Sequence, residues 1–204
     1  MEILTLMLSN NIWWTRQARI RTERRLLSNA SQSQIILFWY SFYSVAVSIY
    51  YIGEPQNLLV SKSWLIYSIL ILAISSFMNG FTYKERANLI KENYLELWTL
   101  YSEARRLETT DQPTVSLEKE YIASMQKCEN HLPKDYIEAL YDNYINSIDK
   151  TKISPHPTDK QIFQAKLYRA LRLGTLTFLY IFPVAISVFM VNGTKFYNMV
   201  MSFL

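Results

Sequence analysis

Few residues of this sequence have types and spacings that suggest chemistry. Cys128 and His131 lie three residues apart, a spacing found in zinc sites and in pairs of a nucleophile with its base. The chain has one cysteine and two histidines, too few for an ordinary zinc site, and its four glycines lie too far apart to build a phosphate-binding loop. We therefore expect no catalytic residue, no metal, no cofactor and no small-molecule substrate, and we predict that the protein is not an enzyme.

Small polar residues inside two apolar stretches are a second group that points to a function. They recur at helical spacing at six positions, Ser41, Ser44, Ser48, Ser68, Ser75 and Asn79. Lipid offers such groups no hydrogen bond, so they should face another helix or water. Two interpretations are open: the packing of a helical hairpin, and a polar path through the membrane in an oligomer.

Five arginines form a third group, Arg16, Arg19, Arg21, Arg24 and Arg25. They precede the first apolar stretch, where they would hold the chain against anionic lipid at about 1 kcal/mol per basic residue near the surface. The alternative is contact with the phosphates of a nucleic acid.

The apolar stretches themselves predict the architecture. Ile35–Ile52 and Trp64–Phe81 each contain 18 residues without Asp, Glu, Lys or Arg. A helix of that length extends about 27 Å, close to the thickness of the hydrocarbon core of a bilayer. Gly53–Ser63, between them, contains Gly, Pro and Asn, which favour a turn. We predict a transmembrane hairpin over residues 35–81.

A third charge-free stretch, Leu173–Val191, predicts a further span within residues 173–204. Pro183 lies in its middle and removes one backbone hydrogen bond, which bends a helix unless neighbours compensate. The Pro-rich segment Lys150–Asp159 predicts a linker, and a basic juxtamembrane helix follows it, so that residues 150–172 lead into this span.

The positions of the charged residues predict the orientation of the hairpin. Lys and Arg gather at both of its ends, as they do on the cytoplasmic side of membranes. Of the 17 acidic residues, 14 lie between Lys84 and Lys160, which disfavours a nucleic-acid-binding domain with a basic face. The single cysteine agrees with a reducing compartment. We expect a multi-pass plasma-membrane protein whose N-terminus is cytoplasmic.

Outside the spans, hydrophobic periodicity predicts further helices. Residues 84–108 place apolar side chains at steps of three and four in one helix that continues the second span. Two more helices are expected over Val115–Cys128 and over Asp135–Asp149, the latter with Asp135 as N-cap and with Ile145 and Ile148 among its buried residues. We predict an all-α fold with a cytoplasmic helical bundle over residues 82–149. Residues 1–34 form an amphipathic, basic segment that either lies in the lipid headgroup layer or packs on the bundle.

Three segments resemble the SLATT family, the SMODS and SLOG-associating two-transmembrane effector domains. They are TERRLLS before the first span, YKERANLIKENYLELWTLYSEARRL after the second, and Glu129-Asn130-His131 followed by Asp135-Tyr136. The last pattern resembles the subgroup found beside reverse transcriptases. The likeness covers roughly residues 15–150 and leaves out the Pro-rich linker and the third span.

The resemblance implies a membrane effector of a bacterial anti-phage defence system, located in the inner membrane. Such an effector oligomerises and perforates or depolarises the membrane when a cytoplasmic sensor is triggered, which causes abortive infection. Depending on the subgroup, the sensor is a nucleotide-signal synthase, a SLOG-type receptor or a reverse transcriptase with its nucleic acid. The alternative is a constitutive anchor that tethers a cytoplasmic partner. The family-like residues 129–136 are expected to form a hydrogen-bonded turn that fixes two helices, or else to contact the partner.

Overall fold

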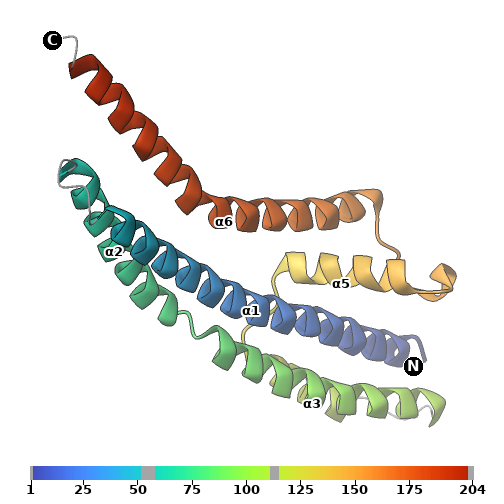
Figure 1. Ribbon diagram of the computed structural model, residues 1–204. Helices are drawn as coiled ribbons and strands as arrows, with labels where there is room; N and C mark the ends of the chain where they lie inside the picture. The colour runs from blue at the N-terminus through green and yellow to red at the C-terminus, as the bar shows by residue number, and fades with distance from the viewer. Residues whose placement is uncertain (1, 52–57, 111–114, 202–204) are drawn as a thin grey trace. The chain divides into compact units, whose positions relative to one another are not determined.

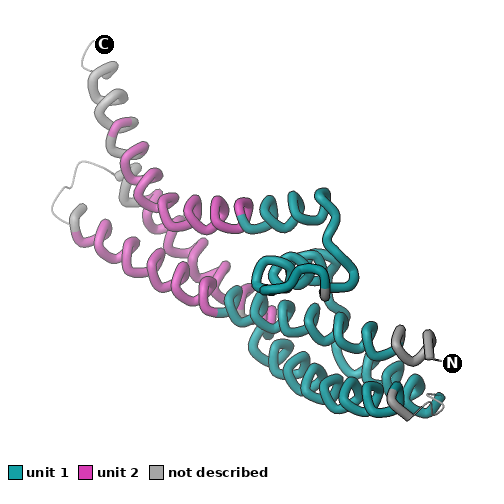
Figure 2. Tube along the Cα trace, turned by 90° about the vertical axis from the view of Figure 1, so that its right-hand side faces the viewer, with its two compact units in different colours: residues 1–30, 82–169 teal, residues 31–81, 170–204 magenta. Residues whose placement is uncertain are grey.

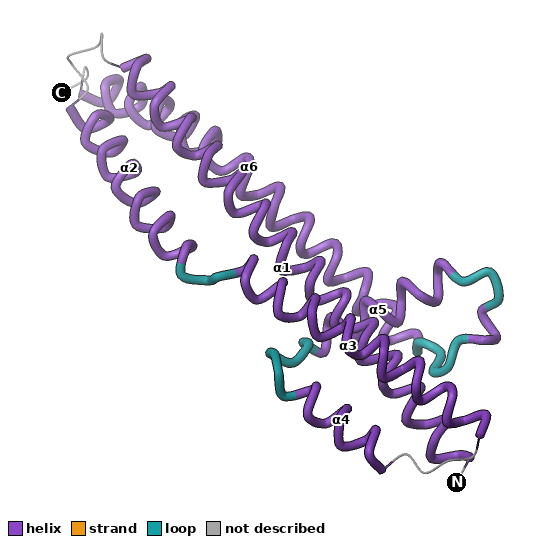
Figure 3. The backbone as a smooth tube through the Cα atoms, turned by 90° about the horizontal axis from the view of Figure 1, so that it is seen from below, coloured by secondary structure: helices purple, strands orange, loops and turns teal. Residues whose placement is uncertain are grey.

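The computed structural model describes residues 2–51, 58–110 and 115–201, with side chains for 8–49, 62–78, 80–108, 115–151, 153–189 and 192. These residues form helices and loops without a strand (Figures 1 and 3). The helices are α1 (Glu2–Tyr51), α2 (Leu58–Asn79), α3 (Tyr83–Thr110), α4 (Val115–Met125), α5 (Pro133–Asn146), a short 3-10 helix (Lys150–Lys152) and α6 (Asp159–Met201). The predicted all-α fold is confirmed.

The chain divides into two compact units, coloured separately in Figure 2. Unit 1 contains Met1–Ala30 and Thr82–Arg169, and unit 2 contains Ser31–Phe81 and Ala170–Leu204. Helices α1 and α6 contribute to both units. This division differs from the one expected from the sequence, because most of the N-terminal segment and the Pro-rich linker belong to unit 1 together with α3, α4 and α5.

The core of unit 1 lies where the predicted apolar stripes meet. Leu8 and Ile12 of α1 pack with Leu97 and Ala104 of α3 and with Leu117 of α4. Of the two interpretations of the N-terminal segment, the structure therefore shows packing on the helical unit. Burial of such side chains contributes roughly 1.5–3 kcal/mol each, which is the main reason why the N-terminal part of α1 joins α3 and α4.

The helix predicted to continue from the second span is interrupted. Helix α2 ends at Asn79 and α3 begins at Tyr83, with a loop between them in Figure 3. Thr82 has a φ of 42°, a left-handed conformation that a residue with a Cβ adopts only at a cost. The N–H groups of Gly80 and Phe81 bond three residues back, which closes the last turn of α2. The predicted continuity is therefore wrong.

Helix α5 also starts earlier than predicted. Pro133 occupies its first turn, and the Asp135 carboxylate accepts the N–H of Leu132 at 3.1 Å, so Asp135 is the third residue of the helix rather than its N-cap. The helix ends at Asn146, so Ile148 lies beyond it and is fully exposed, and Ile145 is half exposed. The predicted burial of these two isoleucines is wrong.

The Pro-rich segment after α5 packs against unit 1. Trp14 Nε1 donates to the backbone oxygen of Ser154 at 2.6 Å, and the rings of Tyr144 and His156 meet edge to face. Helix α6 then begins with a reciprocal cap, in which the Thr158 N–H donates to Gln161 Oε1 at 2.9 Å and the Gln161 N–H donates to Thr158 Oγ1 at 3.3 Å.

Unit 2 has a small aromatic core and a large exposed apolar surface. Trp64, Tyr67 and Ile71 of α2 pack with side chains from α1 and with Ile186 of α6. Many large apolar side chains are instead exposed on all three helices, namely Phe38, Phe42, Ile49, Leu65, Ile66, Ile69, Leu72, Phe77, Phe178, Ile181, Val188 and Phe189. Exposed apolar side chains in such number are typical of helices that face lipid.

Two ranges contain a helical segment long and apolar enough to cross a membrane, namely Lys62–Glu108, which includes most of α2 and α3, and Asp159–Phe189 of α6. Each has an 18-residue window with a mean hydropathy of 1.7, and only 12% and 6% of these windows are buried, unlike the core helices of soluble proteins. The span predicted over Ile35–Ile52 ends at a residue outside the described ones, so it stays a prediction. Residues 53–57 of the predicted turn also lie outside them.

Candidate functional site

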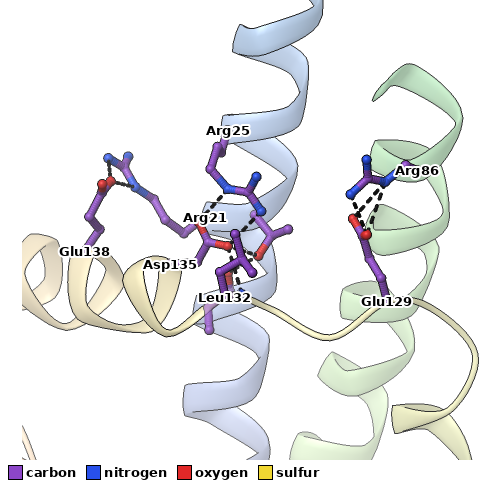
Figure 4. A network of polar contacts seen from close by, with 9 residues as sticks. Arg21, Arg25, Arg86, Glu129, Leu132, Asp135 and Glu138 are labelled. Atoms are coloured by element: carbon purple, nitrogen blue, oxygen red, sulfur yellow. Dashed lines mark hydrogen bonds and ion pairs between the residues drawn. The ribbon is translucent and has the colours of Figure 1, made fainter. Parts of the chain in front are cut away.

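Arginines of α1 and acidic residues of α5 form the main polar cluster of unit 1, which we call the arginine–carboxylate network. Arg21 pairs with Glu138, and Arg25 pairs with Asp135 (Figure 4). Arg21 also lies 3.4 Å from Asp142. The acidic residues at 135, 138 and 142 are spaced by three and four, so they share one face of α5. Arg21 and Arg25 are four residues apart and share one face of α1.

Asp135 has the most hydrogen bonds in this network. Its carboxylate accepts Arg25 Nε at 2.8 Å and Nη2 at 3.0 Å, in the bidentate geometry that makes such pairs strong. It also accepts the hydroxyl of Thr22 at 3.0 Å and the N–H of Leu132 at 3.1 Å. The Asp135 side chain is 2% exposed, so these four donors replace the water that it loses.

Asp142 lies between two arginines from different helices. It faces Arg21 of α1 and pairs with Arg169 of α6, whose guanidinium carbon also lies 4.9 Å from the centroid of the Tyr141 ring. Glu138, Asp142 and Arg169 were missed from the sequence. The signal that would have found them is the spacing of the α5 acids, which matches the spacing of the α1 arginines.

The arginines of α1 differ in their surroundings. Arg19 is fully buried and donates to the backbone oxygen of Met125, at the carbonyl end of α4, where a cation is favoured. Arg19, Arg21 and Arg25 are therefore engaged inside unit 1, and contact of the five arginines with lipid or nucleic acid stays a prediction. Arg16 lies 4.7 Å from the centroid of the Trp98 ring, and Arg24 is exposed.

The family-like turn between α4 and α5 contacts α1 and α3 as well. Glu129 pairs with Arg86 of α3, with Nε at 3.1 Å and Nη2 at 2.5 Å (Figure 4), and Asn130 Oδ1 accepts the N–H of His131 at 3.0 Å. Asp135 bonds to α1 as described above, and Tyr136 meets the ring of Trp14 edge to face. These contacts are those of a structural turn that fixes α4 and α5 against α1 and α3. Contact with a partner stays a prediction.

His131 gives this turn a dependence on pH. Its pKa is lowered, first by burial and then by the charge of Arg19, whereas Asp135 acts in the opposite direction. The unfolded chain therefore binds this proton more readily than the folded chain does. We expect stability to be complete above about pH 6.5 and to be lost as the pH falls through the folded pKa. Unfolding of the full chain measured from pH 7.5 to pH 5 should show this loss, and His131→Gln should reduce it. An unchanged slope in that variant would contradict the assignment.

In unit 2 the structure brings together two of the six small polar residues. Ser44 is buried, and its hydroxyl lies 2.8 Å from the hydroxyl of Ser68, which joins α1 to α2. Ser41 and Ser48 bond instead to backbone oxygens of their own helix, at 2.9 and 2.7 Å. Ser75 is half-buried, and the side chain of Asn79 lies outside those described. These contacts fit hairpin packing, and the polar path stays a prediction.

A side chain of α1 replaces the backbone hydrogen bond that Pro183 cannot donate. Because proline has no N–H, the backbone oxygen of Leu179 loses its helical donor. The hydroxyl of Tyr40 donates to this oxygen at 2.8 Å, and Trp39 Nε1 donates to the next one, Tyr180, at 3.1 Å. Helix α6 bends within its unit 2 portion (Figures 1 and 2). Two aromatic donors of α1 therefore hold the proline-containing part of α6.

Tyr40→Phe tests this pairing, because it removes one hydroxyl and leaves the ring. We expect a loss of about 1 kcal/mol of stability, the usual value for a hydrogen bond between helices in a membrane. In a Pro183→Ala background, where residue 183 regains an N–H, the same change should cost much less. Thermal unfolding in detergent measures both, with Tyr43→Phe as the control. An equal cost in the two backgrounds would show that Tyr40 does not compensate for Pro183.

The sequence was compared with known protein families, curated proteins and solved structures. Residues 5–194 match the SMODS and SLOG-associating two-transmembrane effector domain family 5, one of the SLATT families. The match includes the Pro-rich segment and the apolar part of α6, so the narrower extent expected from the motifs, residues 15–150, was wrong. No curated protein and no solved structure matches the chain. The chain belongs to the SLATT family of membrane effector domains, which are associated with defence systems.

Proposed function

We propose that this protein is the membrane effector of a bacterial anti-phage defence system. On a signal from a cytoplasmic sensor it self-associates and perforates or depolarises the inner membrane, which causes abortive infection. The observation that carries the proposal is the exposed apolar surface of unit 2, present in a chain whose family consists of effector domains. A surface of this kind must be covered by lipid or by further copies of the same helices.

The proposed topology has unit 1 and the N-terminus in the cytoplasm, with three spans formed by the apolar parts of α1, α2 and α6. The excess of Lys and Arg beside the apolar stretches supports this orientation. Cysteine labelling in intact cells tests it, with the native Cys128 replaced by Ser. A probe that cannot cross the membrane should label a cysteine at Asn57 and not one at Glu118. Labelling of Glu118 alone would reverse the topology.

Helices α1 and α6 are the connection through which unit 1 would act on unit 2, because each of them contributes to both units. Asp142 faces an arginine on each of these helices, which supports a coupling role for α5. The proposed sensor is a reverse transcriptase with its nucleic acid, since the turn at residues 129–136 resembles that subgroup. A nucleotide-signal synthase is the other candidate sensor.

The deciding experiment follows membrane potential in cells that express the chain alone or together with its neighbouring genes. A triggered effector collapses the potential only when the complete system is present and challenged by phage. A constitutive anchor, which is the alternative function, leaves the potential unchanged under every condition, and that result would refute the proposal.

A further inference from the structure

Two adjoining cavities open on the surface of unit 1. Their volumes are about 750 and about 370 Å³, and both are lined by Asn143 and Asn146 of α5. Sites for small molecules generally have 300–1,000 Å³. The larger cavity lies between α1, α3, α5 and the segment that follows α5, and the smaller one lies between α1 and α5.

The larger cavity is lined mainly by aromatic rings and amides, without an acidic residue, and its one cation, Arg105, is paired with Glu108. Trp13, Trp14 and Tyr101 supply rings, and Asn10 and Asn146 supply amides. Neither amide forms a hydrogen bond with another described residue, so both keep a donor and an acceptor for a bound molecule. Flat faces of this kind stack on planar rings, and amides bond to the edges of such rings.

The smaller cavity is basic. Arg16, Arg21 and Arg24 line it together with a single acid, Asp142. Arg21 is already paired with Glu138 and Asp142, whereas Arg16 and Arg24 have no acidic partner among the described residues. Two positive charges are therefore available to an anion.

Arg16 lacks an anion in a partly buried position. Its Nε is buried without an acceptor, and burial lowers the pKa of this guanidinium. It interacts with Tyr94 and with the face of Trp98, neither of which carries a negative charge at neutral pH. Trp98 in turn stacks on Tyr101 with ring centroids 5.6 Å apart. The basic lining and the aromatic lining are thus joined through one stack of side chains.

We propose that this double cavity binds a nucleotide, with the base against Trp13 and Tyr101 and the phosphates toward Arg16 and Arg24. Phosphate oxygens would give Arg16 the charged acceptor that it lacks. Stacking on the rings would bury the base, and the free amides would bond to its edge. Binding itself does not depend on the proposed membrane damage, because it is measured on the purified chain.

The test is a calorimetric titration of the full chain in detergent with ATP, GTP, CTP and UTP in turn. We expect saturable binding of at least one of them. If ATP binds, its two fragments, adenosine and inorganic tripolyphosphate, are titrated separately to measure the contributions of the ring and of the phosphates. If another nucleotide binds, its own nucleoside takes the place of adenosine. Each fragment should bind at least about tenfold more weakly than the whole nucleotide, since each lacks half of the contacts. Equal affinity for tripolyphosphate would reduce the site to a phosphate site and overturn the proposal.

Two variants locate the binding in this cavity. Arg16→Gln with Arg24→Gln should lower affinity at least about tenfold, whereas the charge-matched control, Lys84→Gln with Lys119→Gln, should leave it unchanged. Trp13→Leu should lower the affinity for the nucleotide and leave the affinity for tripolyphosphate unchanged. The proposal would be overturned if the unaltered chain bound none of the four nucleotides at millimolar concentration. It would also be overturned if the variant with both arginine changes bound the nucleotide as tightly as the unaltered chain. The comparison of the nucleotide with its fragments uses the unaltered chain and stands even if a variant fails to fold.

Discussion

Replacing Asp135 with alanine is expected to destabilise unit 1 by about 3–5 kcal/mol, because removing one partner of a buried ion pair leaves the other uncompensated. Arg25 and the N–H of Leu132 would lose their acceptor, whereas the Thr22 hydroxyl keeps the backbone oxygen of Ala18 at 3.0 Å. The Arg25 side chain is only 16% exposed. The local effect is measurable as a loss of hydrogen-exchange protection in α5 of the full chain in detergent.

The control for Asp135→Ala is Lys127→Gln, which breaks the exposed pair between Lys127 and Glu96, 2.6 Å apart. Exposed pairs contribute at most about 1 kcal/mol, so this variant should keep nearly all of its protection. A double change of Arg25 and Asp135 to leucine should restore part of the loss, because it removes both buried charges. If Asp135→Ala cost no more than the control, the network would not stabilise unit 1.

The second large effect is expected on membrane depolarisation. Ser44→Leu with Ser68→Leu removes the hydroxyl pair between α1 and α2 and places bulk where Ser44 is 5% exposed. Both segments stay apolar enough to insert. We expect collapse of the potential in the triggered cell to slow by about five- to thirtyfold, as a loss of 1–2 kcal/mol at this contact implies.

The matched control is Ser41→Leu with Ser76→Leu. Both serines are exposed and bond only to a backbone oxygen of their own helix, at 2.9 and 3.1 Å. The two double variants add the same apolar side chains to the same helices, so only the position of the change differs. Activity should survive in the control, with equal amounts of both proteins in the membrane. If the Ser44 and Ser68 variant also remained active, this contact would be hairpin packing without a role in membrane damage.

The sequence by itself determined the helical class and the apolar stretches, because both depend on neighbours along one helix. In α3 the steps of three and four that predicted a buried face are confirmed at Ala87, Ile90, Leu97 and Ala104. The pattern failed at helix ends. Thr82 takes a left-handed conformation, which a threonine does not predict. The contact of Asp135 with Leu132 depends on the residue at which α5 begins, and helix ends are the least predictable part of a helix.

Only the tertiary structure decided the role of the arginines. Arg21 and Arg25 meet acids 117 and 110 residues further along the chain, and a run of basic residues gives no sign of which distant acids will face it. The same holds for Tyr40, whose partner oxygen is 139 residues away and is free only because Pro183 supplies no N–H. Periodicity along a chain records which face of a helix is buried, whereas the partners of a polar side chain are set when helices distant in sequence pack together.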